Sequence, residues 1–408
     1  MREDLHADLL RTLKAGGRLQ SPEVETAFLA VRRHDFLPSH PPEIAYRDQV
    51  VTTKVRDGIP ISASTQPSMM ATMLEQLGLR RGHRVLELGT GTGYNAALMA
   101  HIVGEGGQVV TLDLDEDIVA EARRNLRRAG YQRVACIRGD GGDGYEAAAP
   151  YDRIIVTVGS WDVPPALTRQ LRNGGRLVIP LSIRGPQRSV AFEREPEWLR
   201  SVSVVACDFS TACRGEFAGP VVRQQIAPHG GVYVWSDDAR PFDADITYRL
   251  LAAPSRDESV GVRATVREIF SDIYLWLALH AETFFQLGVT DARVGDISCF
   301  LRIPGKLGLT AGLFDGDTLA VLSLDADQHP ATSFDDPRRF AISIRSAGPD
   351  AETGRRLARL IRTWDQAGRP GTAGLRVLAY PIEVTHDRWP GELVIDKRWS
   401  RLVLSWPQ

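Results

Sequence analysis

The residues best suited to chemistry lie at positions 87–93, in the sequence Glu-Leu-Gly-Thr-Gly-Thr-Gly. An apolar run at residues 85–88 leads into three alternating glycines, and a helix-like segment follows at residues 96–103. A glycine turn between a strand and a helix lets backbone N–H groups approach a ligand closely. The spacing E-x-G-x-G-x-G differs from the dinucleotide pattern G-x-G-x-x-G, so we expect a ligand other than a nicotinamide.

Two acidic residues follow at the ends of the next predicted strands. Asp113 ends an apolar run about 20 residues beyond the glycines, where a Rossmann-like unit places a carboxylate for ribose hydroxyls. Asp140 and Gly141 follow the run at residues 134–138, and a carboxylate there can accept from an adenine amino group. A glycine turn or an aspartate at the end of a strand is common by itself. A tight turn without a ligand does not explain why the glycine turn, Asp113 and Asp140 occur together. The set resembles the first motifs of the S-adenosylmethionine (SAM) methyltransferases.

Elements that would position these residues alternate between strand and helix, which predicts a parallel sheet covered by helices. Helical residues and then an irregular segment are expected over residues 1–60. Two strands within residues 188–207 are expected to form an antiparallel hairpin at the sheet edge. The remaining predictions are helices at 66–79, 93–103, 115–129, 143–147 and 164–171 and strands at 84–88, 108–113, 134–138, 152–157 and 175–181.

The second half of the chain is harder to interpret. Glycine, proline and histidine become frequent around residues 215–245, so we predict a catalytic domain at 1–215, a linker at 216–245 and an accessory domain at 246–408. One aromatic-rich helix is expected over residues 265–287. Further predictions are an amphipathic helix at 350–367 and strands at 318–324, 339–344, 375–380 and 399–406. The accessory domain is therefore expected to be mixed α/β.

Composition restricts the classes of partner. Of the 408 residues, 43% are hydrophobic and 25% charged, and the net charge is −2, so no global field favours nucleic acid or membrane. The N-terminal residues resemble an amphipathic helix without the apolar core of a signal peptide. The cysteines at 136, 207, 213 and 299 are scattered, and although Cys207 and Cys213 could pair or share a metal, no second ligand pair lies nearby. We expect a cytoplasmic protein with reduced cysteines and no metal.

Several ordered motifs resemble the protein-L-isoaspartate O-methyltransferase family over about residues 20–210. Residues 31–38 look like its V-x-R-x-x-F-x-P segment, and residues 45–48 look like its A-Y-x-D. Residues 65–71 are similar to its S-Q-P-x-x-x-A motif, except that Thr65 stands in the serine position. The resemblance implies a Rossmann-like class I SAM-dependent methyltransferase domain, with SAM as cofactor and S-adenosyl-L-homocysteine as product.

Roles for individual residues follow from this resemblance. Thr65, with Ser64 beside it, would orient a substrate carboxylate without acting as a nucleophile; the extra methyl group of threonine narrows the site. A purely structural alternative is a Ser/Thr-rich cap before the helix at 66–79. Glu87 would reach the methionine ammonium through its turn or a water, Asp113 the ribose, and Asp140 the adenine. The full set expected at the cofactor is Glu87, Gly89, Thr90, Gly91, Gly93, Asp113, Leu114, Asp140, Gly141 and Thr157.

The length of the chain bears on the substrate, because residues 216–408 follow a match that is nearly a whole family member. In this the chain resembles long actinobacterial members that methylate an aspartate of a ribosomally made, cyclised precursor peptide. The ester then closes to an aspartimide and can hydrolyse to isoaspartate. That resemblance implies that the second domain holds the precursor peptide. The alternatives are isoaspartate repair in damaged proteins and a non-catalytic peptide-binding protein with a SAM fold; oligomeric state stays open.

Overall fold

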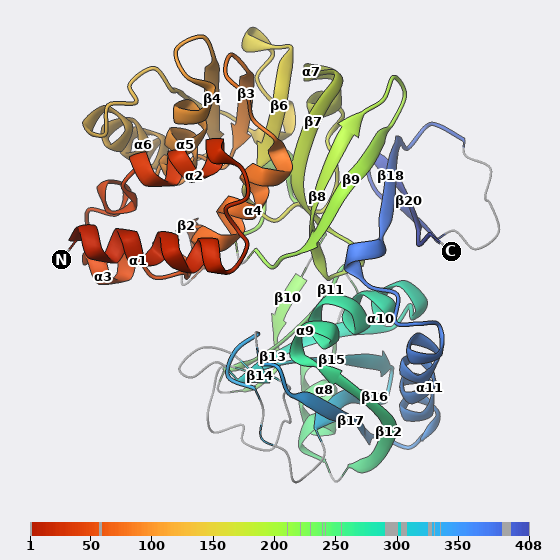
Figure 1. The fold of residues 1–408 in the computed structure, drawn as a ribbon. Helices are drawn as coiled ribbons and strands as arrows, with labels where there is room; N and C mark the ends of the chain where they lie inside the picture. Colours follow the sequence, from red (N-terminus) through yellow and green to blue (C-terminus); the bar gives the residue numbers. More distant parts are fainter. Residues whose placement is uncertain are drawn as a thin grey trace. The chain divides into compact units, whose positions relative to one another are not determined.

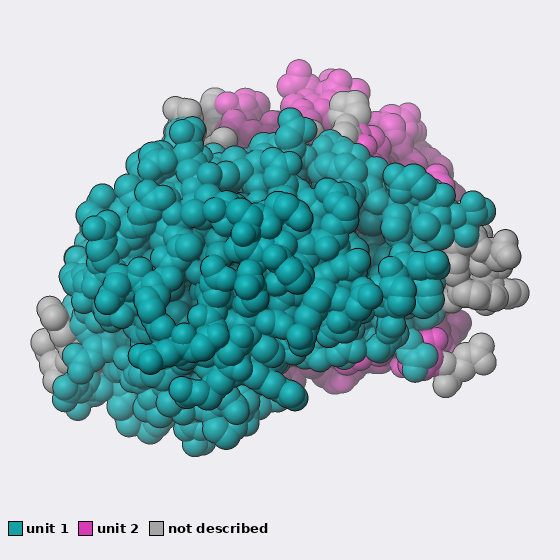
Figure 2. Space-filling model, turned by 90° about the horizontal axis from the view of Figure 1, so that it is seen from above, with its two compact units in different colours: residues 1–181, 187–219, 376–405 teal, residues 182–186, 220–375, 406–408 magenta. Residues whose placement is uncertain are grey.

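The computed structural model describes most of the chain as two compact units. The described residues are 2–56, 59–209, 211–220, 222–228, 230–238, 240, 242–253, 255–289, 301–302, 308–324, 329, 331–334, 336–385 and 393–407. Unit 1 comprises residues 1–181, 187–219 and 376–405, and unit 2 comprises residues 182–186, 220–375 and 406–408 (Figure 2). Each unit is described by itself.

Unit 1 is built on a ten-stranded sheet with the order β19-β20-β18-β9-β8-β7-β6-β3-β4-β5 (Figure 1). Strands β5, β4, β3, β6 and β7 are parallel neighbours, as expected for strands joined by helical crossovers. The bounds are β3 Arg84–Leu88, β4 Gln108–Asp113, β5 Ala135–Arg138, β6 Tyr151–Val156, β7 Leu171–Ser182, β8 Gln187–Arg194 and β9 Leu199–Ala206. The predicted antiparallel hairpin is confirmed, because β8 and β9 pair antiparallel. Its predicted place at the sheet edge is wrong, because β18 pairs with the other side of β9.

One helix precedes the parallel strands and three connect them, all close to the predicted positions. They are α4 Pro67–Leu77, α5 Tyr94–Val103, α6 Glu116–Arg128 and α7 Pro165–Gln170. The predicted helix at 143–147 is wrong: two short 3-10 helices, η2 Gly141–Asp143 and η3 Glu146–Ala148, take its place. Gly144 adopts a φ of 62° between them. A glycine with positive φ interrupts a helix, which explains the break.

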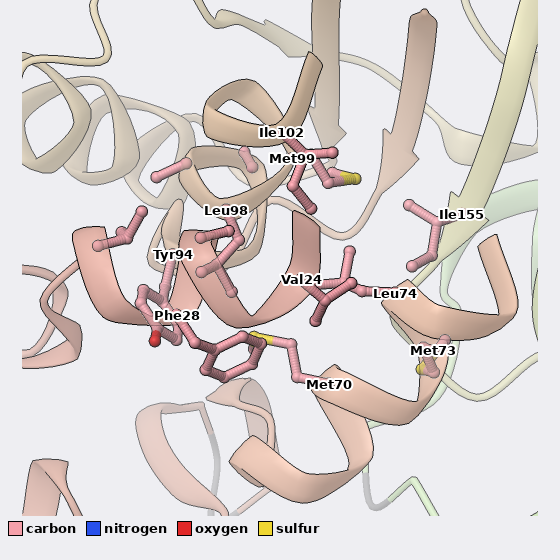
Figure 3. Packing of buried hydrophobic residues seen from close by; sticks show 14 of the residues in the cluster. Val24, Phe28, Met70, Met73, Leu74, Tyr94, Leu98, Met99, Ile102 and Ile155 are labelled. Atoms are coloured by element: carbon pink, nitrogen blue, oxygen red, sulfur yellow. The ribbon is translucent and has the colours of Figure 1, made fainter. Parts of the chain in front are cut away.

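The N-terminal region adds helices and one unpredicted hairpin. The helices are α1 Arg2–Ala15, α2 Pro22–Ala30, η1 Arg33–Phe36 and α3 Pro42–Ala45. The segment that was expected to be irregular contains strands β1 Val51–Arg56 and β2 Ile59–Ser64, which pair antiparallel. Phe28 of α2, Met70 of α4 and Leu98 of α5 share one buried cluster (Figure 3). Burying such side chains contributes about 1.5–3 kcal/mol each, so this cluster fixes α4 and its preceding residues against the sheet.

The last strands of the chain belong to unit 1. Strands β18 Arg376–Pro381, β19 Leu393–Asp396 and β20 Ser400–Ser405 extend the ten-stranded sheet, and β18 pairs with β9. The division of the sequence into consecutive parts at 1–215, 216–245 and 246–408 differs from this arrangement. Strand β9 would be the edge of the sheet without β18, and a distant segment can pair with such an edge without any local signal in the sequence.

Unit 2 has its own eight-stranded sheet, with the order β10-β11-β13-β15-β16-β17-β12 and β14 beside β15. Every strand pair among the described residues of this sheet is antiparallel. The strands are β10 Val222–Gln225, β11 Val232–Ser236, β12 Arg256–Thr265, β13 Phe284–Val289, β14 Leu301–Arg302, β15 Gly308–Asp315, β16 Thr318–Leu324 and β17 Arg339–Ala347. The unit also contains helices α8 Ala244–Ala252 and α11 Glu352–Gln366, and Trp364 of α11 is fully buried.

The single helix predicted over residues 265–287 is only partly right. A helical segment runs through α9 Val266–Glu268, η5 Ile269–Ile273 and α10 Tyr274–His280, but the chain then turns into β13. Ala281 is extended, with φ −134° and ψ 118°. Aromatic residues occur in helices and in buried strands alike. The apolar residues of β13 therefore looked like a continuation of the helix beyond its true end at His280.

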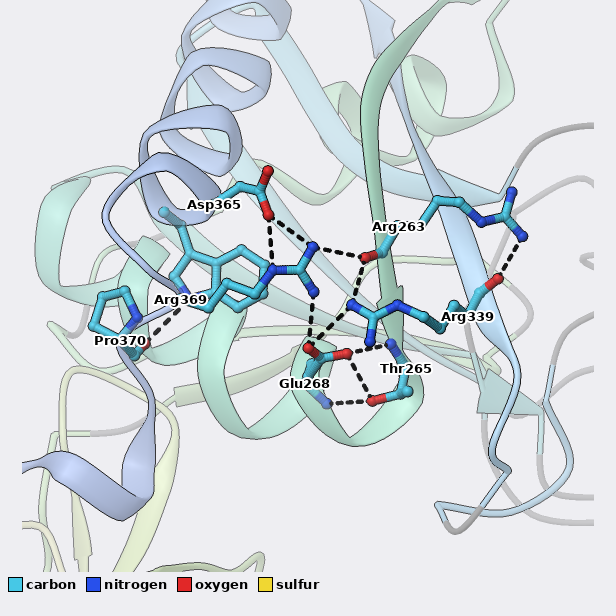
Figure 4. Close-up of polar contacts among 8 residues, drawn as sticks. Arg263, Thr265, Glu268, Arg339, Asp365, Arg369 and Pro370 are labelled. Atoms are coloured by element: carbon cyan, nitrogen blue, oxygen red, sulfur yellow. Dashed lines mark hydrogen bonds and ion pairs between the residues drawn. The ribbon is translucent and has the colours of Figure 1, made fainter.

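A polar network marks the start of that helical segment (Figure 4). Thr265 and Glu268 form a reciprocal capping box, in which the Thr265 N–H donates to Glu268 Oε2 at 2.8 Å. Arg369 and Arg339 donate to Glu268 Oε1 at 2.9 and 3.3 Å. Burial raises the pKa of Glu268, but the Thr265 and Arg369 hydrogen bonds outweigh it and lower the pKa overall. These contacts explain the conformation of unit 2 and involve no residue predicted to act in catalysis.

Candidate active site

The three glycines after β3 have backbone conformations and neighbours that suit a tight ligand cradle. Gly89, Gly91 and Gly93 have φ values of 97°, 50° and 86°, which L-residues rarely adopt. A Cβ on Gly89 would lie 2.6 Å from Thr157 Oγ1, and one on Gly93 would lie 3.1 Å from Leu126 Cγ. Glycine is therefore needed here for conformation and for packing, and the bare backbone remains available at the turn.

The glycine turn and the predicted acids meet at one edge of the sheet. The Gly91 N–H donates to Asp113 Oδ2 at 3.3 Å, and the Gly89 N–H donates to the Leu112 carbonyl at 2.8 Å. The Gly139 N–H donates to the Asp113 carbonyl at 3.0 Å. Gly141 is close enough to β3 that an added Cβ would lie 2.8 Å from Leu88 Cδ2. The ends of β3, β4 and β5 thus bring all three predicted features together.

Asp113 and Asp140 both carry hydrogen bonds from backbone and retain capacity for more, since a carboxylate has about four lone-pair sites. Asp113 is partly buried, and burial raises the pKa of its carboxyl group. Asp140 accepts from the Gly142 N–H at 2.8 Å and from the Glu216 N–H at 2.9 Å. The second contact was not expected: it comes from η4 Gly215–Phe217, which lies against the predicted adenine side.

Glu87 has a different environment from the one expected of a ligand contact. Its side chain is fully buried, and it accepts from Asn95 Nδ2 at 2.8 Å and from Thr111 Oγ1 at 2.7 Å. Thr111 in turn hydrogen bonds to Thr90 of the glycine turn at 2.8 Å. Burial raises the pKa of Glu87 to about 7, against the opposing effect of the Thr111 and Asn95 hydrogen bonds. Glu87 therefore has no exposed surface for direct contact with a ligand, and Thr111 links it to Thr90 of the glycine turn.

Thr157 and Leu114 complete the predicted cofactor set. Thr157 Oγ1 donates to the carbonyls of Leu88 and Gly89 at 3.0 and 2.8 Å, so its hydroxyl supports the glycine turn from the end of β6. Leu114 follows Asp113 directly, and its carbonyl accepts from Arg138 Nε at 3.4 Å. Both residues lie at the carboxyl edge of the parallel strands, where such sheets bind ligands.

The two hydroxyl residues predicted near the substrate differ in burial. Ser64 Oγ is buried and accepts from Arg33 Nη2 at 3.2 Å, which makes Ser64 part of the framework. Thr65 is partly exposed, and its hydroxyl has no hydrogen bond with the described residues. The strand that leads to Thr65 covers the glycine turn, because a Cβ on Gly91 would lie 3.6 Å from the Ala63 carbonyl. Thr65 follows Ala63 by two residues, and its hydroxyl is not engaged by any described residue.

Arg33 and Asp48 hold this region, and the sequence motifs had suggested no role for either. Arg33 is fully buried and donates to the carbonyls of Ala45 and Thr65 at 2.7 and 3.0 Å, among others. Burial lowers its pKa to about 10. Asp48 accepts from the Ser68 N–H at 2.8 Å and from Gln66 at 3.1 Å, which caps the first turn of α4. These side chains connect two of the motifs and fix the backbone at Thr65.

Asp115 is a further residue that sequence reasoning missed. Its carboxylate pairs with Arg56 of β1 at 2.9 Å and with Arg214 from the segment before η4. Burial raises the pKa of Asp115, but the hydrogen bonds from Arg214 and Arg56 outweigh this and lower it. Arg214 therefore pairs within unit 1. The sequence showed a second acidic residue two positions after Asp113. It could not show that Asp115 forms ion pairs, because Arg56 and Arg214 lie far away in the sequence.

Comparison with known proteins decides the family. The family model described as Protein-L-isoaspartate(D-aspartate) O-methyltransferase (PCMT) matches residues 4–215, just over half of the chain. The chain belongs to this family. Members are SAM-dependent carboxyl methyltransferases, so the predicted class I methyltransferase fold, enzyme class and cofactor are confirmed.

Individual relatives share this name. A protein-L-isoaspartate O-methyltransferase of Ignicoccus hospitalis is 43% identical over 179 residues, 44% of this chain and 82% of that one. That of Thermotoga maritima is 43% identical over 173 residues, 42% of this chain and 54% of the relative. A solved structure named protein-L-isoaspartate O-methyltransferase has a TM-score of 0.51 and 26% identity, and the similarity covers 93% of this chain and 96% of that one.

The residues of this methyltransferase fold fit the cofactor. SAM offers ribose hydroxyls and an adenine amino group as donors, and the carboxylates of Asp113 and Asp140 lie at the same edge as the glycine cradle. Within the described residues no group of three or more His, Cys, Asp or Glu could hold a metal ion. Cys136, Cys207 and Cys213 are free thiols, and Cys299 lies outside the described residues. None of the described helices is long and apolar enough to cross a membrane.

Proposed function

We propose that this chain transfers a methyl group to the side-chain carboxylate of an isoaspartyl residue in a peptide or protein. The observation that carries the proposal is the meeting of the glycine turn, Asp113 and Asp140 at one edge, with Thr65 immediately after the strand that covers the turn. Family membership supports the reaction class, and the names of the relatives support an isoaspartyl acceptor.

The chemistry requires positioning more than proton transfer. A carboxylate is already ionised at neutral pH, since its pKa is about 4, so no general base is needed. When bound, SAM would supply a methyl group to a carboxylate oxygen of the substrate: the O–CH3 bond would form as the C–S bond breaks, giving a methyl ester and S-adenosyl-L-homocysteine. Thr65 Oγ would donate to one substrate oxygen and leave the other to attack. Such alignment can contribute on the order of 7–11 kcal/mol.

A cyclised precursor peptide with a target aspartate is the second candidate. Its support was the length of chain beyond the family match, residues 216–408. A solved structure named protein-L-isoaspartate O-methyltransferase is similar over 93% of this chain, so the extra length also occurs in a protein with the general name. This favours the isoaspartyl acceptor as the first proposal. In either case the ester can close to an aspartimide away from the enzyme, because the next backbone nitrogen displaces methanol. The cytoplasmic location also stays a proposal.

The test compares three peptides with the full chain and SAM. One contains isoaspartate, the second contains aspartate at the same position, and the third is a cyclised aspartyl peptide. Mass spectrometry should detect one added methyl group on the isoaspartyl peptide first, followed by loss of methanol. Preferential methylation of the cyclised aspartyl peptide would support the second candidate. Failure to bind S-adenosyl-L-homocysteine in calorimetry would contradict both and leave a non-catalytic binding protein.

A further inference from the structure

The loop after β6, residues 157–163, borders the site on the side opposite the acids in the strand order. Thr157 at its start holds the glycine turn through the Gly89 carbonyl at 2.8 Å. Two backbone hydrogen bonds tie the loop to residues just beyond β9: the Gly159 N–H donates to Thr211 and the Cys213 N–H donates to Gly159, each at 2.8 Å. All of these residues lie within the family match at 4–215.

A second support for this loop comes from residues 397–400, the turn between β19 and β20, far outside the family match. Asp162 is only 1% exposed and accepts from the Trp399 N–H at 2.7 Å and from Ser400 Oγ. Lys397 is 7% exposed; its Nζ donates to the Trp161 carbonyl and lies 4.8 Å from the centre of the Trp161 ring. The buried ammonium of the turn thus contacts Trp161 of the loop, and the buried carboxylate of the neighbouring Asp162 contacts the turn in return.

The same turn also reaches η4 on the adenine side. Arg398 Nη1 donates to the Glu216 carbonyl at 3.1 Å, and the rings of Trp399 and Phe217 lie 6.4 Å apart. The N–H of Glu216 is the group that donates to Asp140. The turn at 397–400 therefore contacts both the loop after β6 and the segment that hydrogen bonds to a predicted cofactor residue.

We propose that the turn at 397–400 positions the methyl-transfer site, with Lys397 and Asp162 as its positioning residues. Burying charged groups is costly unless they are hydrogen bonded, so both groups favour the one loop conformation in which their partners are in place. A loop displaced by about 1 Å can reduce a rate about a hundredfold, because transfer needs an aligned attack. This inference rests on the proposed function, and it makes the end of the chain part of the catalytic unit.

The experiment uses the full chain with Lys397→Met, Lys397→Arg and, as a matched control, Arg401→Met. Arg401 lies on β20, and its contacts in the described chain are with Asp396 and Val384. We expect K397M to lower kcat for the isoaspartyl peptide about 10- to 100-fold with a smaller change in KM, since alignment is what it loses. K397R should recover most of this, and R401M should match the wild type.

A second readout separates this inference from the proposed function. Amide hydrogen exchange should be faster at residues 157–163 in K397M, and the affinity for S-adenosyl-L-homocysteine, measured by calorimetry, should fall. If K397M keeps the wild-type kcat and the wild-type exchange, the positioning role is wrong. If the wild type methylates no isoaspartyl peptide, the proposed function fails, while exchange and cofactor affinity still decide the role of the turn. Ser400→Ala, which removes one donor to Asp162, replaces K397M if that variant does not fold.

Discussion

The glycine-turn side of the site and the loop after β6 are stabilised by different parts of the chain. On the glycine side, Gly91 contacts Asp113 and Glu87 contacts Asn95, so the partners lie within a few tens of residues of one another. At the loop after β6, Asp162 contacts Trp399 across more than half of the chain. The glycine-turn side of the site therefore forms from a continuous stretch of sequence. The loop after β6 depends instead on contacts with the turn between the C-terminal strands β19 and β20.

The largest effect is expected from removing the acid at the centre of the glycine-turn side. Asp113→Ala removes the acceptor of the Gly91 N–H and the predicted acceptor for the ribose hydroxyls. Hydrogen bonds to charged groups contribute about 1.5–3 kcal/mol each, so the affinity for S-adenosyl-L-homocysteine should fall on the order of 100-fold. Calorimetry measures this, with Glu121→Ala at an exposed position of α6 as the control. An unchanged affinity would mean that the cofactor does not depend on this edge.

Gly89→Ala should sharpen the view of the turn itself. The new Cβ would lie 2.6 Å from Thr157 Oγ1, on a backbone with φ 97°. The matched control is Gly130→Ala, where φ is 85° and no atom lies within 4 Å of the added Cβ. In both variants an alanine must adopt a positive φ, which costs about 1–2 kcal/mol of stability. Any further loss of stability in G89A therefore measures the clash with Thr157. Denaturant unfolding should show G89A to be less stable than G130A by about 2 kcal/mol; equal losses would refute the close packing.

Glu87 gives a pH test of the buried network. Burial raises its pKa in the folded state to about 7, above its ordinary value of 4.5, so the protonated form is favoured in the folded state. The stability this contributes is complete below about pH 4.5 and is lost as the pH rises through about 7. Between pH 5 and 8 the free energy of unfolding should fall by about 2 kcal/mol more in the wild type than in Glu87→Gln. Thermal unfolding across that range measures it, and Glu116→Gln on exposed α6 is the control. Parallel pH profiles for the wild type and E87Q would contradict the buried environment.

The sequence predicts the parts of the site that depend on local contacts and misses those that depend on contacts between distant segments. The positions of Gly89, Asp113 and Asp140 at strand ends were predictable, because strand patterning and glycine chemistry are local. The framework role of Ser64 was not, since it depends on Arg33, which lies 31 residues away. The strands after residue 375 were recognised as strands but not as part of the catalytic sheet. Periodicity identifies a strand, whereas its partner depends on long-range packing that no short window contains.

The smallest effect concerns the ion pair that joins the β1–β2 hairpin to Asp115, two residues beyond the end of β4. Arg56 and Asp115 lie 2.9 Å apart with side chains 49% and 12% exposed, so Arg56→Ala should change stability by less than about 1 kcal/mol. Arg172→Ala is a close match, because Arg172 and Asp152 lie 2.7 Å apart with 52% and 14% exposure, away from the glycine turn. We expect similar small shifts in melting temperature for both variants, and a few-fold rise in KM for SAM in R56A alone. This rise should shrink at high salt, since screening weakens exposed pairs. If R172A raises the KM for SAM equally, the β1–β2 hairpin does not contribute specifically to cofactor binding. Cofactor binding on this side of the site would then depend on the glycine turn and its neighbouring strand ends alone.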